Sequence, residues 1–192
     1  MKGIVTLALA AAVSLPLAAG EIHGKVVCKG VRDSGDAVVY VESVPGKTFP
    51  PPKEHALINQ ENLRFGPHVL PVLAGTTVDF QNSDAVLHNV FSPDACAEKF
   101  NLGTWPKGEK RSRTFRKECF AALLCMVHPE MEAWIAVLPT PYYAVTAPDG
   151  SYRIPNVADG TYVLKVWHPR FKTTQKSVTV HDSTDADFEL GR

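Results

Sequence analysis

The segment from Glu118 to Leu138 constrains the fold of this chain more than any other. It consists of an apolar run, a short loop and a second apolar run, which is the pattern of two β-strands joined by a loop. The loop carries Cys125, His128 and Met131 at C-x2-H-x2-M spacing. A thiolate, an imidazole and a thioether on one loop suit a soft or borderline metal ion. The segment therefore predicts two strands that present a metal site.

A second imidazole is needed to complete such a site, and His88 is the candidate. It lies in the apolar run 86–91, which follows the turn signal of residues 82–84. Two histidines, one cysteine and a distant axial methionine form the ligand set of blue copper sites. Zinc is the weaker alternative because it seldom binds a thioether. Copper is therefore the expected ion.

The composition predicts an all-β chain. Fifteen Pro and thirteen Gly residues are mostly scattered between short apolar runs, as in chains of many short strands. Residues 101–108 are rich in turn formers, and residues 110–117 are basic and polar, so we expect a turn followed by a solvated hairpin there. The 20 basic and 20 acidic residues balance, so no long-range field favours a nucleic acid or an anionic membrane.

Residues 1–20 have the pattern of a cleaved signal peptide. Lys2 precedes an apolar run over residues 4–19, and small residues follow at its end. The run is too short and too rich in alanine for a membrane span. We therefore expect an exported protein, periplasmic or secreted, that begins near Glu21 and does not span the membrane.

The chain has four cysteines, which in an exported protein usually means two disulfides. If Cys125 binds metal, three cysteines remain and that pairing fails. A bridge between Cys96 and Cys119 would join the two segments that carry ligands, and Cys28 would then be a free, buried thiol. The sequence alone does not fix this connectivity.

At these residues the chain resembles the cupredoxin family, particularly its plastocyanin-like and amicyanin-like members. In that family a His followed by Asn supplies the first ligand, and a C-x2-H-x2-M or longer loop supplies the others. The resemblance covers roughly residues 55–139 and implies a Greek-key β-sandwich. It also implies that His88, Cys125 and His128 are the strong ligands. Met131 would be the weak axial ligand, and the Asn89 side chain would brace the two ligand segments.

The resemblance further implies a function in electron transfer. A type 1 copper protein of this kind carries single electrons between redox proteins such as a c-type cytochrome and a dehydrogenase, and is not an enzyme. Oxidases and nitrite reductases need additional copper ligands, which the other scattered histidines do not supply. Two alternatives stay open, namely a copper carrier or storage protein and a docking module with a vestigial copper site. A monomer is the default expectation.

Residues 147–166 resemble the carboxypeptidase-regulatory or transthyretin-like β-sandwich modules. Those modules begin with a G-x-V strand and a V-x-V strand, and here both patterns lie far upstream, at residues 24–26 and 38–41. The resemblance therefore implies a small sandwich that is discontinuous in sequence. This module carries no nucleophile, acid–base pair or phosphate-binding loop, so docking or scaffolding is its expected role.

The expected domain division follows from this layout. A copper domain at residues 46–139 is inserted into a sandwich made of residues 21–45 and 140–192. The alternative is a tandem arrangement, in which residues 21–45 supply the first strands of the copper domain. Contacts of Val26 and Val39 distinguish the two layouts.

Overall fold

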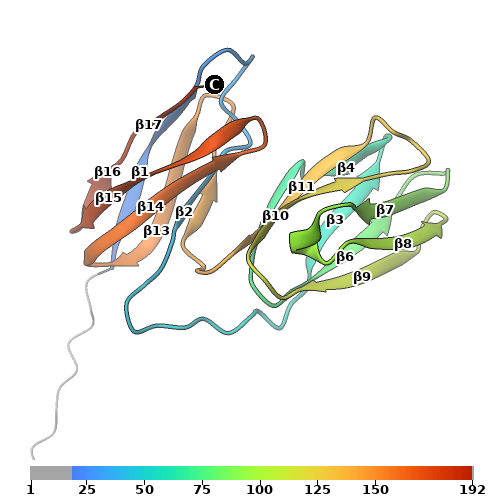
Figure 1. Ribbon diagram of the computed structural model, residues 1–192, viewed down its shortest axis with the longest axis horizontal. Coiled ribbons are helices and arrows are strands. Elements are labelled where there is room, and N and C mark those ends of the chain that lie inside the picture. Colours follow the sequence, from blue (N-terminus) through green and yellow to red (C-terminus); the bar gives the residue numbers. More distant parts are fainter. Residues whose placement is uncertain (1–18, 192) are drawn as a thin grey trace, which may run out of the picture.

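A computed structural model describes residues 19–191, and in it the chain forms two β-sandwiches that lie side by side (Figure 1). The predicted all-β class is confirmed, because the one helical element among the described residues is the short 3-10 helix η1 (Ala95–Ala97). Within the same residues no helix is long and apolar enough to cross a membrane. The predicted signal peptide lies outside the described residues, apart from Ala19 and Gly20.

The inner sandwich is built from two sheets with strand orders β4-β3-β6-β9 and β5-β11-β10-β7-β8. Its core contains Trp105, Phe80, Ile135 and Cys125, all nearly inaccessible to solvent. The strands are β3 (Ala56–Glu61), β4 (Arg64–Gly66), β5 (Val69–Leu73), β6 (Thr76–Asn82), β7 (His88–Ser92), β8 (Phe100–Trp105), β9 (Lys110–Phe115), β10 (Cys119–Leu124) and β11 (Glu132–Leu138).

The outer sandwich has one sheet of order β12-β2-β14-β15 and a second in which β1 pairs with β13, β16 and β17. Its core contains Ile22, Val26, Leu164 and Val166. The strands are β1 (Ala19–Cys28), β2 (Val38–Val41), β12 (Tyr143–Val145), β13 (Ser151–Ala158), β14 (Gly160–His168), β15 (Phe171–Val180), β16 (Ser183–Asp185) and β17 (Phe188–Leu190).

The chain leaves the outer sandwich after β2 and returns to it at β12, so all strands of the inner sandwich lie between these two in sequence. β2 pairs with both β12 and β14, and Val39 lies opposite Val166. The outgoing connection, residues 42–55, is proline-rich and has no ladder of its own, because proline lacks the N–H donor. It runs along one side of the molecule in Figure 1.

β2 and β11 pack the two sandwiches together. Side chains alternate between the faces of a strand, so Val39 and Val41 face the outer core while Val38 and Tyr40 face the inner sandwich. This explains why all four residues of β2 are buried. The opposing surface consists of apolar and aromatic residues of β5, β10 and β11: Val69, Ala136, Leu138, Phe120 and Trp134.

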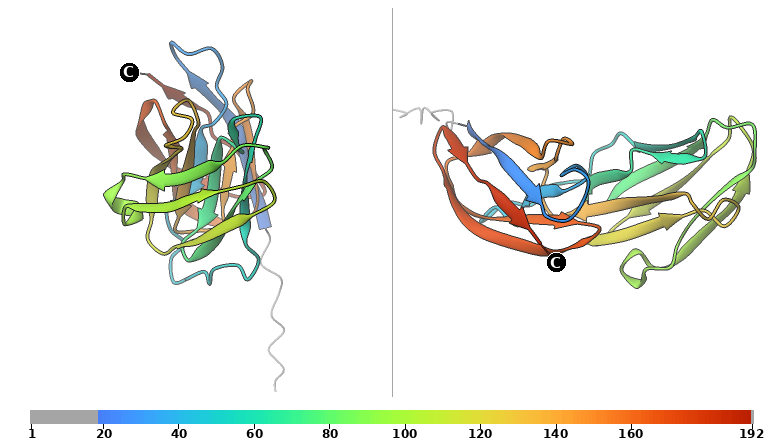
Figure 2. Two further views of the ribbon diagram at one scale, coloured as in Figure 1. Left: turned by 90° about the vertical axis from the view of Figure 1, so that its right-hand side faces the viewer. Right: turned by 90° about the horizontal axis from the view of Figure 1, so that it is seen from above.

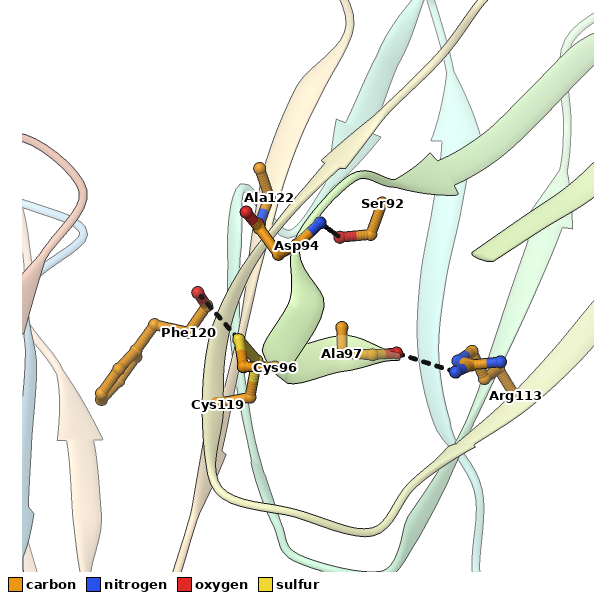
Figure 3. Close-up of a disulfide and its surroundings, with 8 residues drawn as sticks. All are labelled: Ser92, Asp94, Cys96, Ala97, Arg113, Cys119, Phe120 and Ala122. Carbon is orange, nitrogen blue, oxygen red and sulfur yellow. Dashed lines mark hydrogen bonds between the residues drawn. A yellow bond between two sulfur atoms is a disulfide. The ribbon is translucent and has the colours of Figure 1, made fainter. Parts of the chain in front are cut away.

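Strand β10 is held along one edge by contacts other than a strand ladder. It pairs with β7 through Leu124 and Phe91 alone. Further along, the Ala122 N–H donates to Oδ2 of Asp94 at 2.7 Å, and a disulfide joins Cys96 in η1 to Cys119 (Figure 3). These contacts replace the missing ladder, so the strand that leads to Cys125 is fixed at both ends.

Two of our local expectations were wrong. Residues 100–105 form strand β8, which pairs with β7, instead of a turn-rich segment. Residues 110–115 form strand β9, which pairs with β6 over six residues, instead of a solvated hairpin. The basic side chains of β9 are largely exposed because the strand lies at the edge of its sheet.

Candidate metal centre

The rigid pair β10 and β11 holds the loop that carries the predicted ligands. Six residue pairs join the two strands, from Cys119 with Val137 to Leu124 with Glu132. Burial alternates along β10, and continuing this alternation past the strand brings Cys125 onto the buried face, where it is 3% exposed. The loop lies at the end of the inner sandwich that points away from the outer sandwich (Figures 1 and 2).

Three of the predicted ligands converge on one point. One donor atom from each of His88, Cys125 and His128 lies within 4.8 Å of the other two, and the Nδ1 atoms of the two imidazoles are 3.1 Å apart. Two nitrogens that are each about 2.0–2.1 Å from a metal ion are about 3.1 Å apart when the N–metal–N angle is about 100°. The two imidazoles and the thiol therefore fit a single metal ion.

The three residues differ in their exposure. His88 is fully buried at the start of β7, and Cys125 is almost so, whereas His128 is only partly buried. The two imidazole rings meet edge to face, with centroids 4.9 Å apart. The His128 ring is therefore the part of the group nearest to solvent.

Met131 lies at the end of the same loop and is 1% exposed. It belongs to the core cluster that contains Cys125, and its N–H donates to the His128 carbonyl oxygen at 3.0 Å. A buried thioether at the end of the loop that carries a thiol and an imidazole suits a weak axial ligand of copper.

Asn89 connects the two segments that carry the candidate ligands. Its Oδ1 accepts the N–H of Met126 at 3.3 Å, and its Nδ2 donates to Asn101 and to the Gly103 carbonyl oxygen. Because the Met126 N–H is directed to Asn89, that donor serves to brace the loop.

Asp84 is a neighbour of the site that our sequence analysis missed. Its Oδ2 lies 2.8 Å from Nε2 of His88, and its two oxygens also accept the N–H groups of Asn62 and Leu63. Burial alone would raise the pKa of Asp84, but these hydrogen bonds outweigh it and hold that pKa below its usual range. The available signal was an acidic residue four positions before a candidate ligand, at the end of a turn.

Exposed apolar side chains lie on the segments next to the candidate ligands. Leu87 precedes His88 and is 51% exposed, and Met126 follows Cys125 and is 65% exposed. Three further large apolar residues are exposed on adjoining segments: Leu63, Val86 and Val127. The rim, defined here as these five residues, is the exposed apolar surface of the segments that carry or adjoin the candidate ligands.

Four of the five other histidines make hydrogen bonds elsewhere in the molecule. His55 contacts Asp79, and His68 contacts Asp36 across the boundary between the two sandwiches. His181 pairs with an exposed aspartate, and Nδ1 of His168 accepts the N–H of Arg170. None of these four joins the group at Cys125.

Comparisons with known proteins bear on both halves of the chain. Residues 131–191 match the family model of the carboxypeptidase regulatory-like domain. A purple cupredoxin from Nitrosopumilus maritimus is 26% identical, with 43% of this chain and 98% of that chain covered and a TM-score of 0.39. The chain thus combines the two likenesses predicted from its sequence. The comparison with curated proteins finds no match.

Two further solved structures are each similar over about half of the chain. The copper(I) form of an amicyanin variant is 21% identical, with 53% of this chain and 98% of that chain covered and a TM-score of 0.42. A copper-containing nitrite reductase from Thermus scotoductus SA-01 is 26% identical, with 52% of this chain and 25% of that chain covered and a TM-score of 0.43. The family match begins at residue 131, so it also includes β11 of the inner sandwich.

Proposed function

We propose that this protein is an exported type 1 copper protein that carries single electrons between redox proteins. The observation that carries the proposal is the convergence of His88, Cys125 and His128, whose donor atoms lie within 4.8 Å of one another. Together with the buried Met131 at the end of the same loop, they make up the donor set that blue copper sites use. When bound, one copper ion supplies a reversible one-electron couple.

The surrounding protein favours a site whose geometry is the same in two oxidation states. The ladder of β10 and β11 fixes the ends of the loop, and Asn89 joins that loop to β7. His88 and Cys125 are shielded from water by burial in the core. Because these groups are held before any electron arrives, little reorganisation is needed on transfer.

The exposed edge of His128 and the apolar rim support a carrier that meets its partners briefly. Small interfaces suit such encounters because the partners must separate quickly. We propose a c-type cytochrome or a dehydrogenase as the partner, with the protein working in the periplasm or outside the cell. Among residues 19–191, a single group of three or more His, Cys, Asp and Glu residues could hold a metal ion, which favours a carrier over a multicopper enzyme.

We also propose the inserted domain layout, with residues 46–139 as the copper domain and residues 21–45 and 140–192 as the surrounding sandwich. The pairing of β2 with β14 supports this division, and so does the common core of Val26, Val39, Tyr162 and Val166. The outer sandwich would then serve as a scaffold or docking module, at the end of the molecule away from the metal centre.

Electron self-exchange of the copper-loaded protein tests the carrier function. We expect a reversible redox couple and fast self-exchange, measured by voltammetry and by NMR line broadening in mixtures of the two oxidation states. Leu87→Lys should slow self-exchange, since it places a charge in the rim of both partners. Leu57→Lys is the matched control, because Leu57 is 49% exposed on β3 and lies outside the rim.

The redox couple also distinguishes electron transfer from the alternative function. A protein that binds copper through Cys125 but has no reversible couple would be a carrier or storage protein for the metal. Equal slowing by Leu87→Lys and Leu57→Lys would contradict the assignment of the rim as the contact surface.

A further inference from the structure

Asp84 connects a strained turn to the most deeply buried candidate ligand. Its Oδ1 accepts the Asn62 N–H at 2.7 Å, and its Oδ2 accepts the Leu63 N–H at 2.9 Å. The same Oδ2 lies 2.8 Å from Nε2 of His88. One carboxylate therefore serves three N–H groups, two from the backbone of a distant hairpin and one from a histidine that is completely buried.

The hairpin between β3 and β4 adopts a costly conformation to make these contacts. Glu61 pairs with Arg64, and the two residues between them, Asn62 and Leu63, have φ values of 55° and 57°. Two left-handed residues form a type I′ turn, for which Asn-Gly is the favoured sequence. A leucine in the left-handed region is strained, because its Cβ lies too close to the following carbonyl oxygen. The conformation directs both N–H groups at the Asp84 carboxylate.

Asp84 is itself held in place from its own side. Its N–H donates to Oδ1 of Asn82 at 2.9 Å. The Asn82 side chain is fully buried, and its Nδ2 donates to the carbonyl oxygens of Val86 and Trp105. The carboxylate therefore has a fixed position relative to β7 and β8, and with it the contact to His88.

This arrangement determines which nitrogen of His88 carries the proton. An ionised carboxylate is an acceptor only, so Nε2 of His88 must be the donor. In a neutral imidazole the other nitrogen, Nδ1, then holds a free lone pair. Nδ1 is the atom that faces Nδ1 of His128 at 3.1 Å, within the group of converging donors.

We propose that Asp84, anchored by the β3–β4 turn, is a positioning residue that fixes His88 with its Nδ1 lone pair directed at the metal and increases its donor strength. This inference rests on the proposed copper site. A carboxylate on the far nitrogen makes an imidazole a more basic ligand. The more basic ligand stabilises Cu(II) more than Cu(I), so Asp84 lowers the reduction potential.

Copper affinity and potential of three variants test the proposal. Removing such a hydrogen-bond partner typically weakens metal binding by about 10–100-fold, and we expect that loss in Asp84→Ala, measured by chelator competition. Asp84→Asn keeps the shape of the side chain and one accepting oxygen, so it should fold, bind copper with intermediate affinity and have a higher potential than the parent. Thermal unfolding of the metal-free variants verifies that each is folded.

Glu130→Gln is the matched control. Glu130 is exposed in the same loop as His128, so its replacement removes an identical charge near the site without touching His88. We expect nearly unchanged affinity and potential in this variant. Equal changes in Glu130→Gln and Asp84→Asn would overturn the proposal, because long-range charge would then account for both.

The metal-free protein provides a separate readout. In the parent, the Nε2 proton of His88 should exchange slowly with water and appear downfield in ¹H–¹⁵N spectra, and this signal should be lost in Asp84→Ala. If the parent protein forms no thiolate–copper band, the proposed function fails. If the parent is blue and folded Asp84→Ala binds copper as tightly, only the role of Asp84 fails.

Discussion

Asp79 is a buried carboxylate on β6 whose charge is balanced by three neighbours. Lys110 and Ser112 donate to it at 2.6 Å, and Nδ1 of His55 lies 2.9 Å away. Burial alone would raise its pKa, but these contacts outweigh burial and lower the pKa of Asp79 to about 2. Asp79 thus contributes stability that is present above its ordinary pKa of 3.8 and lost as the pH falls toward 2.

Asp79→Asn should therefore destabilise the protein at neutral pH by about 1–3 kcal/mol, since hydrogen bonds to a buried charge are lost. Urea unfolding at pH 7 and near pH 2 measures the effect, and the difference between variant and parent should shrink at the lower pH. Asp185→Asn is the control, because Asp185 is exposed at the edge strand β16. A difference between variant and parent that persists near pH 2 would contradict this account of Asp79.

The residue types of the candidate site could be predicted from the sequence, whereas part of its surroundings could not. His88, Cys125 and His128 were chosen by donor chemistry and loop spacing, and they are the residues whose donor atoms converge. Asp84 was missed because its backbone partners lie 21 and 22 positions away in sequence. Only the folded hairpin brings those donors to it.

At the scale of elements, β10 depends on contacts outside its own ladder. Asp94 and the bridge between Cys96 and Cys119 hold the part of its edge that β7 leaves free. The double variant Cys96→Ala/Cys119→Ala should lose about 2–4 kcal/mol of unfolding free energy. The copper spectrum should persist, because the six pairs with β11 still fix Cys125.

Denaturant unfolding and thiol counting check the role of the bridge. The unfolded, unreduced protein should expose two thiols, those of Cys28 and Cys125, and four after reduction. Cys28→Ala removes a buried free thiol and leaves the bridge intact, so it is the control for the double variant. Four reactive thiols before reduction would show that the bridge is absent in solution.

The strands that the sequence predicted best are those with apolar or alternating patterns, such as β10 and β11. β8 and β9 were missed because their composition is typical of turns and of solvent-exposed segments. β8 contains a glycine, and β9 begins with four charged or polar residues. Both are edge strands, in which one side of the ladder and much of the side-chain surface face water. Pairing with a neighbouring strand, which local composition does not reveal, decides such cases.

On the scale of the whole molecule, aromatic rings couple the two sandwiches. Phe120 of the inner sandwich stacks on Trp167 of the outer one, with centroids 4.6 Å apart and an interplanar angle of 11°. Trp134 also contacts Trp167 at 5.5 Å. A double-mutant cycle of Phe120→Leu and Trp167→Leu should give a coupling energy of about 0.5–1.5 kcal/mol, measured by chemical unfolding.

A second cycle provides the control for this interface. Phe188 is as buried as Trp167 but belongs to the core of the outer sandwich. The effects of Phe120→Leu and Phe188→Leu should therefore add to within about 0.3–0.5 kcal/mol. Additive effects in the Phe120 and Trp167 cycle as well would mean that the two sandwiches do not support each other through these rings.

The central claim is that Cys125 binds copper as a thiolate, and the absorption and electron paramagnetic resonance spectra of the Cu(II)-loaded protein test it most directly. For the parent we predict an intense visible thiolate-to-copper band and a narrow copper hyperfine splitting, and Cys125→Ser should lose both. A pale parent protein with an ordinary tetragonal copper signal, unchanged in Cys125→Ser, would contradict the claim.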